Sequence, residues 1–143
     1  MIRKAFALAA VLALPAMVHA QGAKVYAESN LRAPFEEAST AFSAYRAGSV
    51  AFEFGPSGVL KDRLARGEPA DLFASADIEH LQSLAQAGKS GPMKLFARNR
   101  QGAEYGFIVM KGASPTGNAF ANFLLGAEGQ RILAAAGFSP PGR

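Results

Sequence analysis

Segments typical of buried strands alternate with segments of helical periodicity along this chain, and that alternation limits its fold more than any other feature. Short strands are predicted at residues 24–27, 50–54 and 71–74, and each is followed by a predicted helix. Three such units in succession favour a largely parallel sheet with helices on both faces. Further strands and helices are predicted at residues 94–97, 105–110, 115–125 and 127–136. The predicted fold class is therefore α/β, a three-layer sandwich with a mixed, mostly parallel central sheet.

Residues 1–20 have the pattern of a signal peptide for export. A positive start leads into an apolar run, and small residues then stand at the −3 and −1 positions of a cleavage site: Arg3 and Lys4, Ala5–Met17, and Val18 and Ala20. The apolar run is too short to cross a bilayer of about 30 Å. We expect cleavage after Ala20, which leaves residues 21–143 as a single domain in the periplasm.

Composition excludes several classes of function. The chain has no cysteine, so disulfides, thiolate metal sites and a lipidated N-terminal cysteine are excluded. The net charge is +4 at pH 7, but the basic residues are scattered, so no nucleic-acid partner is expected. His80 is the only histidine after residue 20, and the carboxylates are dispersed, so no metal site is expected.

Two junctions between a predicted strand and a predicted helix carry small polar residues, Glu28–Leu31 and Gly55–Gly58. The first N–H groups of a helix point outward and the helix dipole favours negative charge there. Ser29 or Asn30 at the first junction and Ser57 at the second would add neutral donors for a small oxyanion. The alternative is that these residues only cap the helices, which is worth about 1 kcal/mol each.

An enzymatic alternative is a small serine hydrolase that uses Ser57 and His80. The segment Gly55–Gly58 does not match the G-x-S-x-G motif of such enzymes, because Val59 occupies the last glycine position. His80 follows Glu79 on a predicted helix and is expected at a solvated surface. We therefore expect no catalysis and no labelling of Ser57 by a fluorophosphonate.

Seven segments of the chain carry a resemblance to a known family. They are Val25–Leu31, Phe52–Gly58, Gly67–Asp77, Leu95–Arg100, Glu104–Val109, Phe123–Gln130 and Gly137–Phe138. Together they resemble the molybdate- and tungstate-binding proteins of ABC importers, which are type II periplasmic binding proteins. They include two loops that hold the oxyanion in that family and the strand that leaves its first lobe. The resemblance extends over nearly all of residues 25–141.

This resemblance implies periplasmic binding of a tetrahedral oxyanion such as molybdate or tungstate and its delivery to the permease of an ABC importer, without catalysis or a cofactor. The implied oxyanion ligands are Ser57, Tyr105 and either Ser29 or Asn30. The serine that precedes leucine in the family aligns with Asn30 here, and Ser29 falls one position earlier. The choice between these two residues stays open.

The family has two lobes, and much of the second lobe lies between segments that are almost adjacent in this chain. Only Gln101–Glu104 separates Arg100 from Tyr105, so roughly 100 residues are missing relative to the family pattern. We expect residues 21–100 and 104–143 to form one lobe, with Tyr105 on an exposed cleft face open to self-association. Binding would be weakened, and the alternative is a truncated remnant that folds but binds nothing.

Overall fold

The computed structural model describes Ala10, residues 22–45 and residues 48–142. Apart from Ala10, the predicted signal peptide lies outside the described residues. Strands and helices follow in the order β1 Ala23–Glu28, 3-10 helix η1 Ser29–Leu31, α1 Arg32–Tyr45, β2 Val50–Gly55, α2 Ser57–Ala65, β3 Leu72–Ser75, α3 Ile78–Gln86, β4 Lys94–Arg98, β5 Glu104–Val109, α4 Pro115–Leu125 and α5 Ala127–Ala135. Within this described part, no helix combines the length and the apolar character that crossing a membrane requires.

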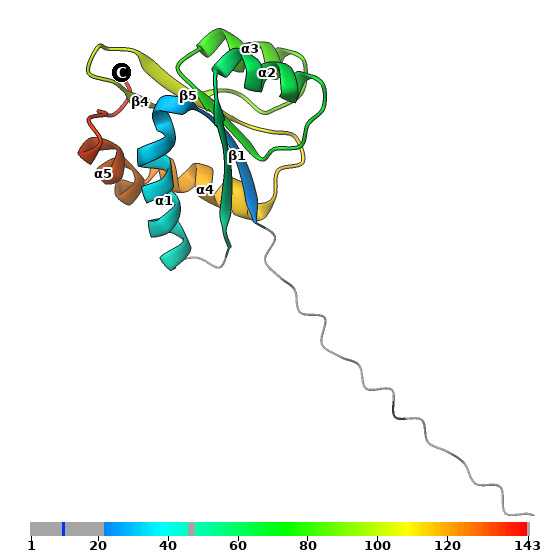
Figure 1. The fold of residues 1–143 in the computed structure, drawn as a ribbon, viewed down its shortest axis with the longest axis horizontal. Helices are drawn as coiled ribbons and strands as arrows, with labels where there is room; N and C mark the ends of the chain where they lie inside the picture. Colours follow the sequence, from blue (N-terminus) through cyan, green and yellow to red (C-terminus); the bar gives the residue numbers. More distant parts are fainter. Residues whose placement is uncertain (1–9, 11–21, 46–47, 143) are drawn as a thin grey trace, which may run out of the picture.

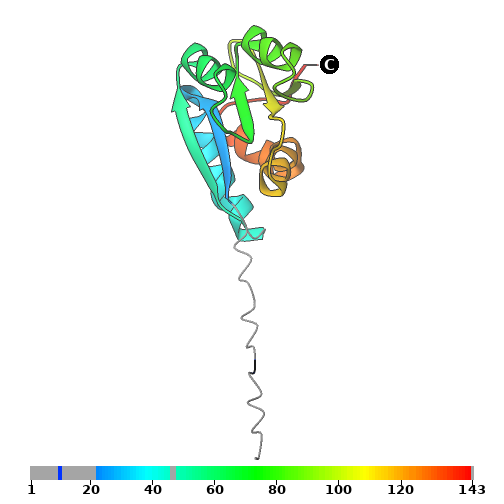
Figure 2. The ribbon, with the colours of Figure 1, turned by 90° about the vertical axis from the view of Figure 1, so that its right-hand side faces the viewer.

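The five strands form one sheet in the order β2-β1-β3-β5-β4. β1 pairs in parallel with both β2 and β3, and β2 forms an edge of the sheet beside β1 (Figure 2). β5 is antiparallel to both of its neighbours, β3 and β4. β4 therefore runs in the same direction as β1, β2 and β3, and β5 alone runs against them. The predicted mixed, mostly parallel α/β sheet is confirmed.

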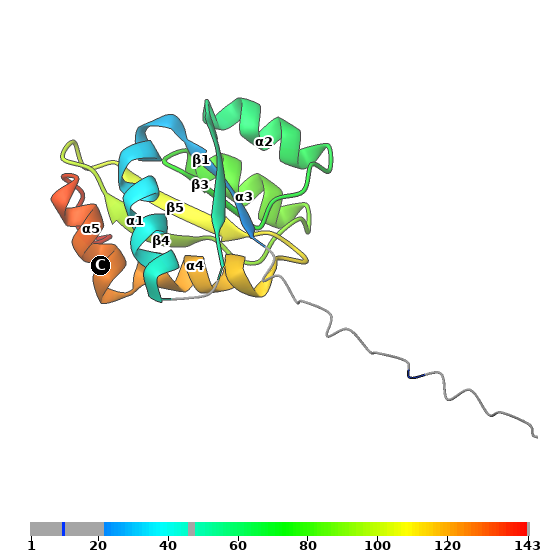
Figure 3. The same ribbon diagram turned by 60° about the horizontal axis from the view of Figure 1, so that its bottom comes forward.

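The helices form one layer on each face of the sheet. Helices α2 and α3 cover one face, and α1, α4 and α5 cover the other (Figures 1 and 3). Side chains alternate along β1, so Val25 and Ala27 enter the core under α1, α4 and α5, whereas Tyr26 enters the core under α2 and α3. The larger core is rich in phenylalanine, with Phe35, Phe42, Phe96, Phe107 and Phe120 all buried.

The junction at Gly55–Gly58 connects β2 almost directly to α2. Gly55 ends β2, and Ser57 already begins α2, so Pro56 is the only residue between the two elements. Pro56 has φ −61° and ψ 134°, which is extended backbone that leads directly into a first helical turn. The strand-to-helix junction is therefore tight, and it holds Ser57 close to the end of the sheet.

The connection between β4 and β5 is a short turn. The N–H of Asn99 donates to the carbonyl of Ala103 at 3.0 Å, and the N–H of Ala103 donates to Oδ1 of Asn99 at 2.8 Å. Gly102 has φ 88°, a left-handed conformation that favours glycine. The turn places β4 and β5 side by side as an antiparallel pair.

Candidate functional site

All residues predicted to hold an oxyanion lie at the end of the sheet where β1, β2 and β3 terminate, which we call the carboxyl edge. The carboxyl ends of β1, β2 and β3 meet at this edge because the three strands are parallel neighbours. The amino end of β5 lies there as well, because β5 is antiparallel to β3. The residues at this edge are Ser29 and Asn30 after β1, Ser57 after β2 and Tyr105 at the start of β5. Ligands of open α/β sheets bind at such edges.

Asn30 and Tyr105 form one polar pair. The Nδ2 of Asn30 donates to the hydroxyl of Tyr105 at 2.6 Å, and Asn30 itself is exposed. The exposure predicted for Tyr105 is wrong, because only 2% of this residue is accessible. Phe138, in the segment after α5, packs edge-on against its ring at a centroid distance of 5.3 Å. The hydroxyl of Tyr105 therefore accepts a hydrogen bond from Asn30, and the buried ring does not line an open face of the sheet.

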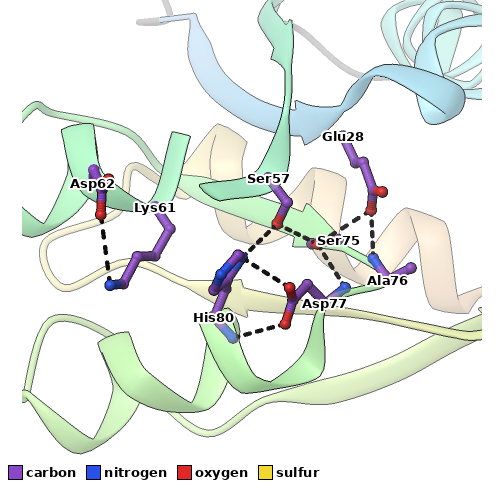
Figure 4. Close-up of polar contacts among 8 residues, drawn as sticks. All are labelled: Glu28, Ser57, Lys61, Asp62, Ser75, Ala76, Asp77 and His80. Carbon is purple, nitrogen blue, oxygen red and sulfur yellow. Dashed lines mark hydrogen bonds and ion pairs between the residues drawn. The ribbon is translucent and has the colours of Figure 1, made fainter. Parts of the chain in front are cut away.

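Ser57 belongs to a second polar group on the side of the sheet covered by α2 and α3 (Figure 4). Its Oγ lies 2.6 Å from Oγ of Ser75 and 3.1 Å from Nδ1 of His80. Ser75 accepts a hydrogen bond from the N–H of Asp77 at 2.8 Å and donates to Oε2 of Glu28 at 3.2 Å. The same Glu28 oxygen accepts the N–H of Ala76 at 2.7 Å.

Ser75 and Glu28 are members of this group that the sequence does not single out. Ser75 is fully buried and is the only buried polar or charged residue in the described part of the chain. The sequence does contain a signal that could have identified Ser75. It is a small polar residue at the end of β3, just as Ser29 and Ser57 lie beside the ends of β1 and β2. Buried polar groups require partners, which explains the dense bonding around Ser75.

The capping interpretation of Ser57 is wrong. Ser57 is the first residue of α2, the N-cap position is Pro56, and no side chain caps this helix. No side chain caps η1 after Glu28 either. Asp77 caps α3 by accepting the N–H of His80 at 3.3 Å. The first turn of α2 thus keeps N–H groups that point out of the helix end.

The geometry around His80 differs from that of a serine hydrolase. His80 is not at a fully solvated surface, because its side chain is 31% exposed and contacts both Ser57 and Asp77. Oδ2 of Asp77 lies 3.3 Å from Nδ1, the same ring nitrogen that contacts Ser57. A catalytic triad needs the serine and the carboxylate on opposite ring nitrogens, so this arrangement is not a proton relay.

One ion pair, between Arg98 and Glu104, lies near this edge. Arg98, at the end of β4, donates to Glu104 at 3.0 Å through Nε and at 2.5 Å through Nη2. These hydrogen bonds hold the pKa of Glu104 below its usual range. Across the part of the chain that the structure describes, no three histidine, aspartate or glutamate side chains gather to hold a metal ion. The candidate donors Ser29, Asn30 and Ser57 are neutral side chains.

Curated relatives match parts of the chain. An uncharacterized protein of Pasteurella multocida is 38% identical over 77 residues, which is 54% of this chain and 32% of that protein. The molybdate-binding protein ModA of Mycobacterium tuberculosis H37Rv is 39% identical over 72 residues, which is 48% of this chain and 28% of that protein. The chain thus spans about a third of the length of the curated relatives that it matches.

Solved structures share the fold at low sequence identity. A Clostridium difficile protein described as the substrate-binding domain of a molybdenum ABC transporter has a TM-score of 0.78 and 13% identity, covering 85% of this chain and 100% of that chain. The periplasmic molybdate-binding protein of Azotobacter vinelandii has a TM-score of 0.75 and 13% identity, covering 84% and 100%. The sulfate-binding protein SubI of Mycobacterium tuberculosis has a TM-score of 0.71 and 12% identity, covering 84% and 87%.

The family assignment comes from a sequence model that matches more than half of the chain. Residues 23–102 match the model of the bacterial extracellular solute-binding proteins. The matched segment runs from β1 through β4 and includes both polar strand-to-helix junctions. The chain therefore belongs to the family of bacterial extracellular solute-binding proteins.

Proposed function

We propose that this chain binds a tetrahedral oxyanion of the molybdate or tungstate type in the periplasm, as the solute-binding component of an ABC importer. The observation that carries the proposal is the position of Ser57 at an uncapped helix start, in the same sheet edge as Asn30. Uncapped helix N-termini and neutral side-chain donors suit an anion. The names of the molybdate-binding relatives agree with this ligand class.

We assign the donors of the first loop and the second loop to Asn30 and Ser57. Nδ2 of Asn30 carries two hydrogens, and only one is used by the hydroxyl of Tyr105. Tyr105 thereby fixes the direction of the second hydrogen, which is free for a ligand. Ser29 is also exposed at this edge, and it stays the alternative donor of the first loop.

Binding is proposed to be weak because donors come from one side of the ligand. The short turn from Asn99 to Ala103 stands where the family pattern inserts a second lobe. Charge-assisted hydrogen bonds to an anion lose value when water keeps access to it. We expect a dissociation constant of about 0.1–1 mM, which corresponds to about 4–5.5 kcal/mol.

A thermal melting experiment tests this proposal. Molybdate or tungstate at about 10 mM should raise the melting temperature, because a ligand at about 10 to 100 times its dissociation constant stabilises the folded state by about 1.4–2.7 kcal/mol. Ser57→Ala should remove the shift, since it deletes the hydroxyl at the start of α2. Ser83→Ala is the matched control, because Ser83 is exposed on α3 and lies outside the site.

The outcomes of the melting experiment separate the alternatives. Anion-dependent shifts in the wild type and Ser83→Ala, but not in Ser57→Ala, support the proposal. No shift in the wild type would identify a folded remnant that binds no oxyanion. A micromolar dissociation constant would contradict the single-lobe site and indicate that a second copy of the chain closes over the anion.

Export is a further part of the proposal, and it predicts the N-terminus of the mature protein. After expression in a Gram-negative host, protein from the periplasm should begin at Gln21, because Val18 and Ala20 place small residues before that bond. N-terminal sequencing or intact mass measurement checks this. Periplasmic protein that still carries Met1 would contradict cleavage at this site.

A further inference from the structure

A short antiparallel ribbon lies at the end of the sheet opposite the carboxyl edge. One arm follows α3, and the other leads from the end of β5 toward α4 (Figure 1). Backbone hydrogen bonds join the arms on both sides of a bridge between Ser90 and Met110, with N–H to carbonyl distances of 2.9 and 3.0 Å. The residues that face each other across the ribbon are Lys89 and Lys111, Ser90 and Met110, and Gly91 and Val109.

The ribbon places two lysines opposite each other on one face. Side chains alternate along each arm, so the lysine pair and the Gly91–Val109 pair share a face, whereas Met110 enters the core under α2 and α3. Opposite residues of such a ribbon have Cβ atoms about 4.5–5.5 Å apart, and like charges there are destabilising. Lys89 and Lys111 are both exposed. A bound anion would therefore stabilise this lysine pair.

The lysine pair has no carboxylate partner within the described residues. The ion pairs of that part of the chain include neither Lys89 nor Lys111. Asp71 and Lys111 line a common hollow of about 230 Å³. The two carboxylate oxygens of Asp71 already accept backbone N–H groups, from Ser114 at 2.6 Å and from Lys24 at 2.7 Å. The positive charge of the pair is therefore available to a ligand.

A second hollow, of about 540 Å³, opens beside the lysine pair and has the size of a small-molecule site. It is lined by Lys111, by Val109 and Ala113, and by Asn118 near the start of α4. Gly91 also lines it and leaves it open, because within 4 Å a Cβ at this position would meet only the carbonyl oxygen of Val109, at 4.0 Å. The hollow thus combines a cationic rim with an apolar wall.

We propose that this hollow is a second binding site, which takes a small organic carboxylate with an apolar body. The carboxylate pairs with Lys111 and Lys89, and the apolar body lies over Gly91 against Val109, where its burial adds to the affinity. An inorganic oxyanion has no apolar part to bury there. The site lies at the opposite end of the sheet from the carboxyl edge, so it goes beyond the proposed function and does not depend on it.

The test is an amide NMR titration of the full chain with octanoate, and with acetate as a carboxylate that lacks an apolar body. Octanoate should bind with a dissociation constant of about 1 mM, a value in keeping with a ligand of this size. Its largest shifts should fall on the amides of Gly91, Gly112 and Ala113, which line the hollow. Acetate should bind at least about tenfold more weakly, because it buries little apolar surface.

Two substitutions test the charge and the hollow separately. Lys111→Gln should weaken octanoate binding about fivefold, because it removes one of the two positive charges. Gly91→Leu should abolish binding, because its side chain occupies the hollow. Gly91 is not among the glycines with positive φ, so its backbone tolerates a side chain.

Each substitution has a matched control away from the ribbon. Lys61→Gln, on α2, changes the net charge by the same amount as Lys111→Gln. Gly126→Leu adds the same side chain as Gly91→Leu at an exposed glycine after α4, whose φ is −80°. Both controls should bind octanoate like the wild type. The amide spectrum shows whether each variant folds, and the wild type and Lys111→Gln decide the question if Gly91→Leu does not fold.

Octanoate binding that is weakened by Lys111→Gln, abolished by Gly91→Leu and intact in both controls supports the inference. It is overturned if octanoate at about 10 mM, ten times the expected dissociation constant, shifts no amide of the wild type. It is also overturned if acetate binds as tightly as octanoate, or if Lys111→Gln or a folded Gly91→Leu binds octanoate like the wild type. Each of these results leaves oxyanion binding at the carboxyl edge untouched.

Discussion

Replacing Phe35 by alanine is expected to destabilise the protein by about 3–5 kcal/mol. Phe35 is fully buried on α1, and its ring packs against those of Phe52, Phe96 and Phe120 at centroid distances of 6.2, 5.8 and 6.1 Å. These three rings belong to β2, β4 and α4, so the substitution opens a cavity where three elements meet. Rigid neighbours from separate elements collapse poorly into such a cavity. Urea denaturation measures the change in the free energy of unfolding.

Tyr45→Ala provides the control for Phe35→Ala. Tyr45 is the last residue of α1 and is 78% exposed, so truncating this exposed aromatic side chain of the same helix should cost less than about 0.5 kcal/mol. A loss below about 1 kcal/mol for Phe35→Ala would show that the core relaxes around the missing ring. It would contradict a core organised around these phenylalanines.

The second large effect is expected for Leu72→Ala, at about 2–5 kcal/mol. Leu72 begins β3, the central strand of the sheet, and all four residues of this strand are buried. Its Cα partners are Val25 on β1 and Val109 on β5. Helices cover both faces of β3, so solvent cannot fill the space that the side chain leaves. Denaturant melts at equilibrium measure the loss.

Leu125→Ala is the control for Leu72→Ala. Leu125 is the last residue of α4 and is 39% exposed, so the same chemical change there should cost less than about 1 kcal/mol. If Leu72→Ala costs no more than Leu125→Ala, the central place of β3 in the sheet is wrong. The position of Leu72 also bears on the candidate site, because Ser75 lies three residues further along the same strand.

The sequence by itself determined the strands, the helices and the end of the sheet at which the candidate site residues lie. The periodicity of residues 115–125 predicted α4 with the bounds that the structure shows. Short buried segments predicted all five strands to within about two residues, as is usual for local patterns. The order of strand and helix then implied that the polar residues after β1 and β2 share one edge, because parallel neighbouring strands end on the same side.

Only the tertiary structure decided which side chains meet at that edge. Asn30 meets Tyr105 across 75 residues of sequence, and Glu28 meets Ser75 across 47. The burial of Tyr105 depends on Phe138, which returns to the sheet after α5. Local patterns report the preferences of a segment for helix, strand and burial, whereas these contacts depend on how separate segments pack. The sequence therefore indicated the end of the sheet where the candidate residues lie, and packing determined their hydrogen bonds and the position of Glu28.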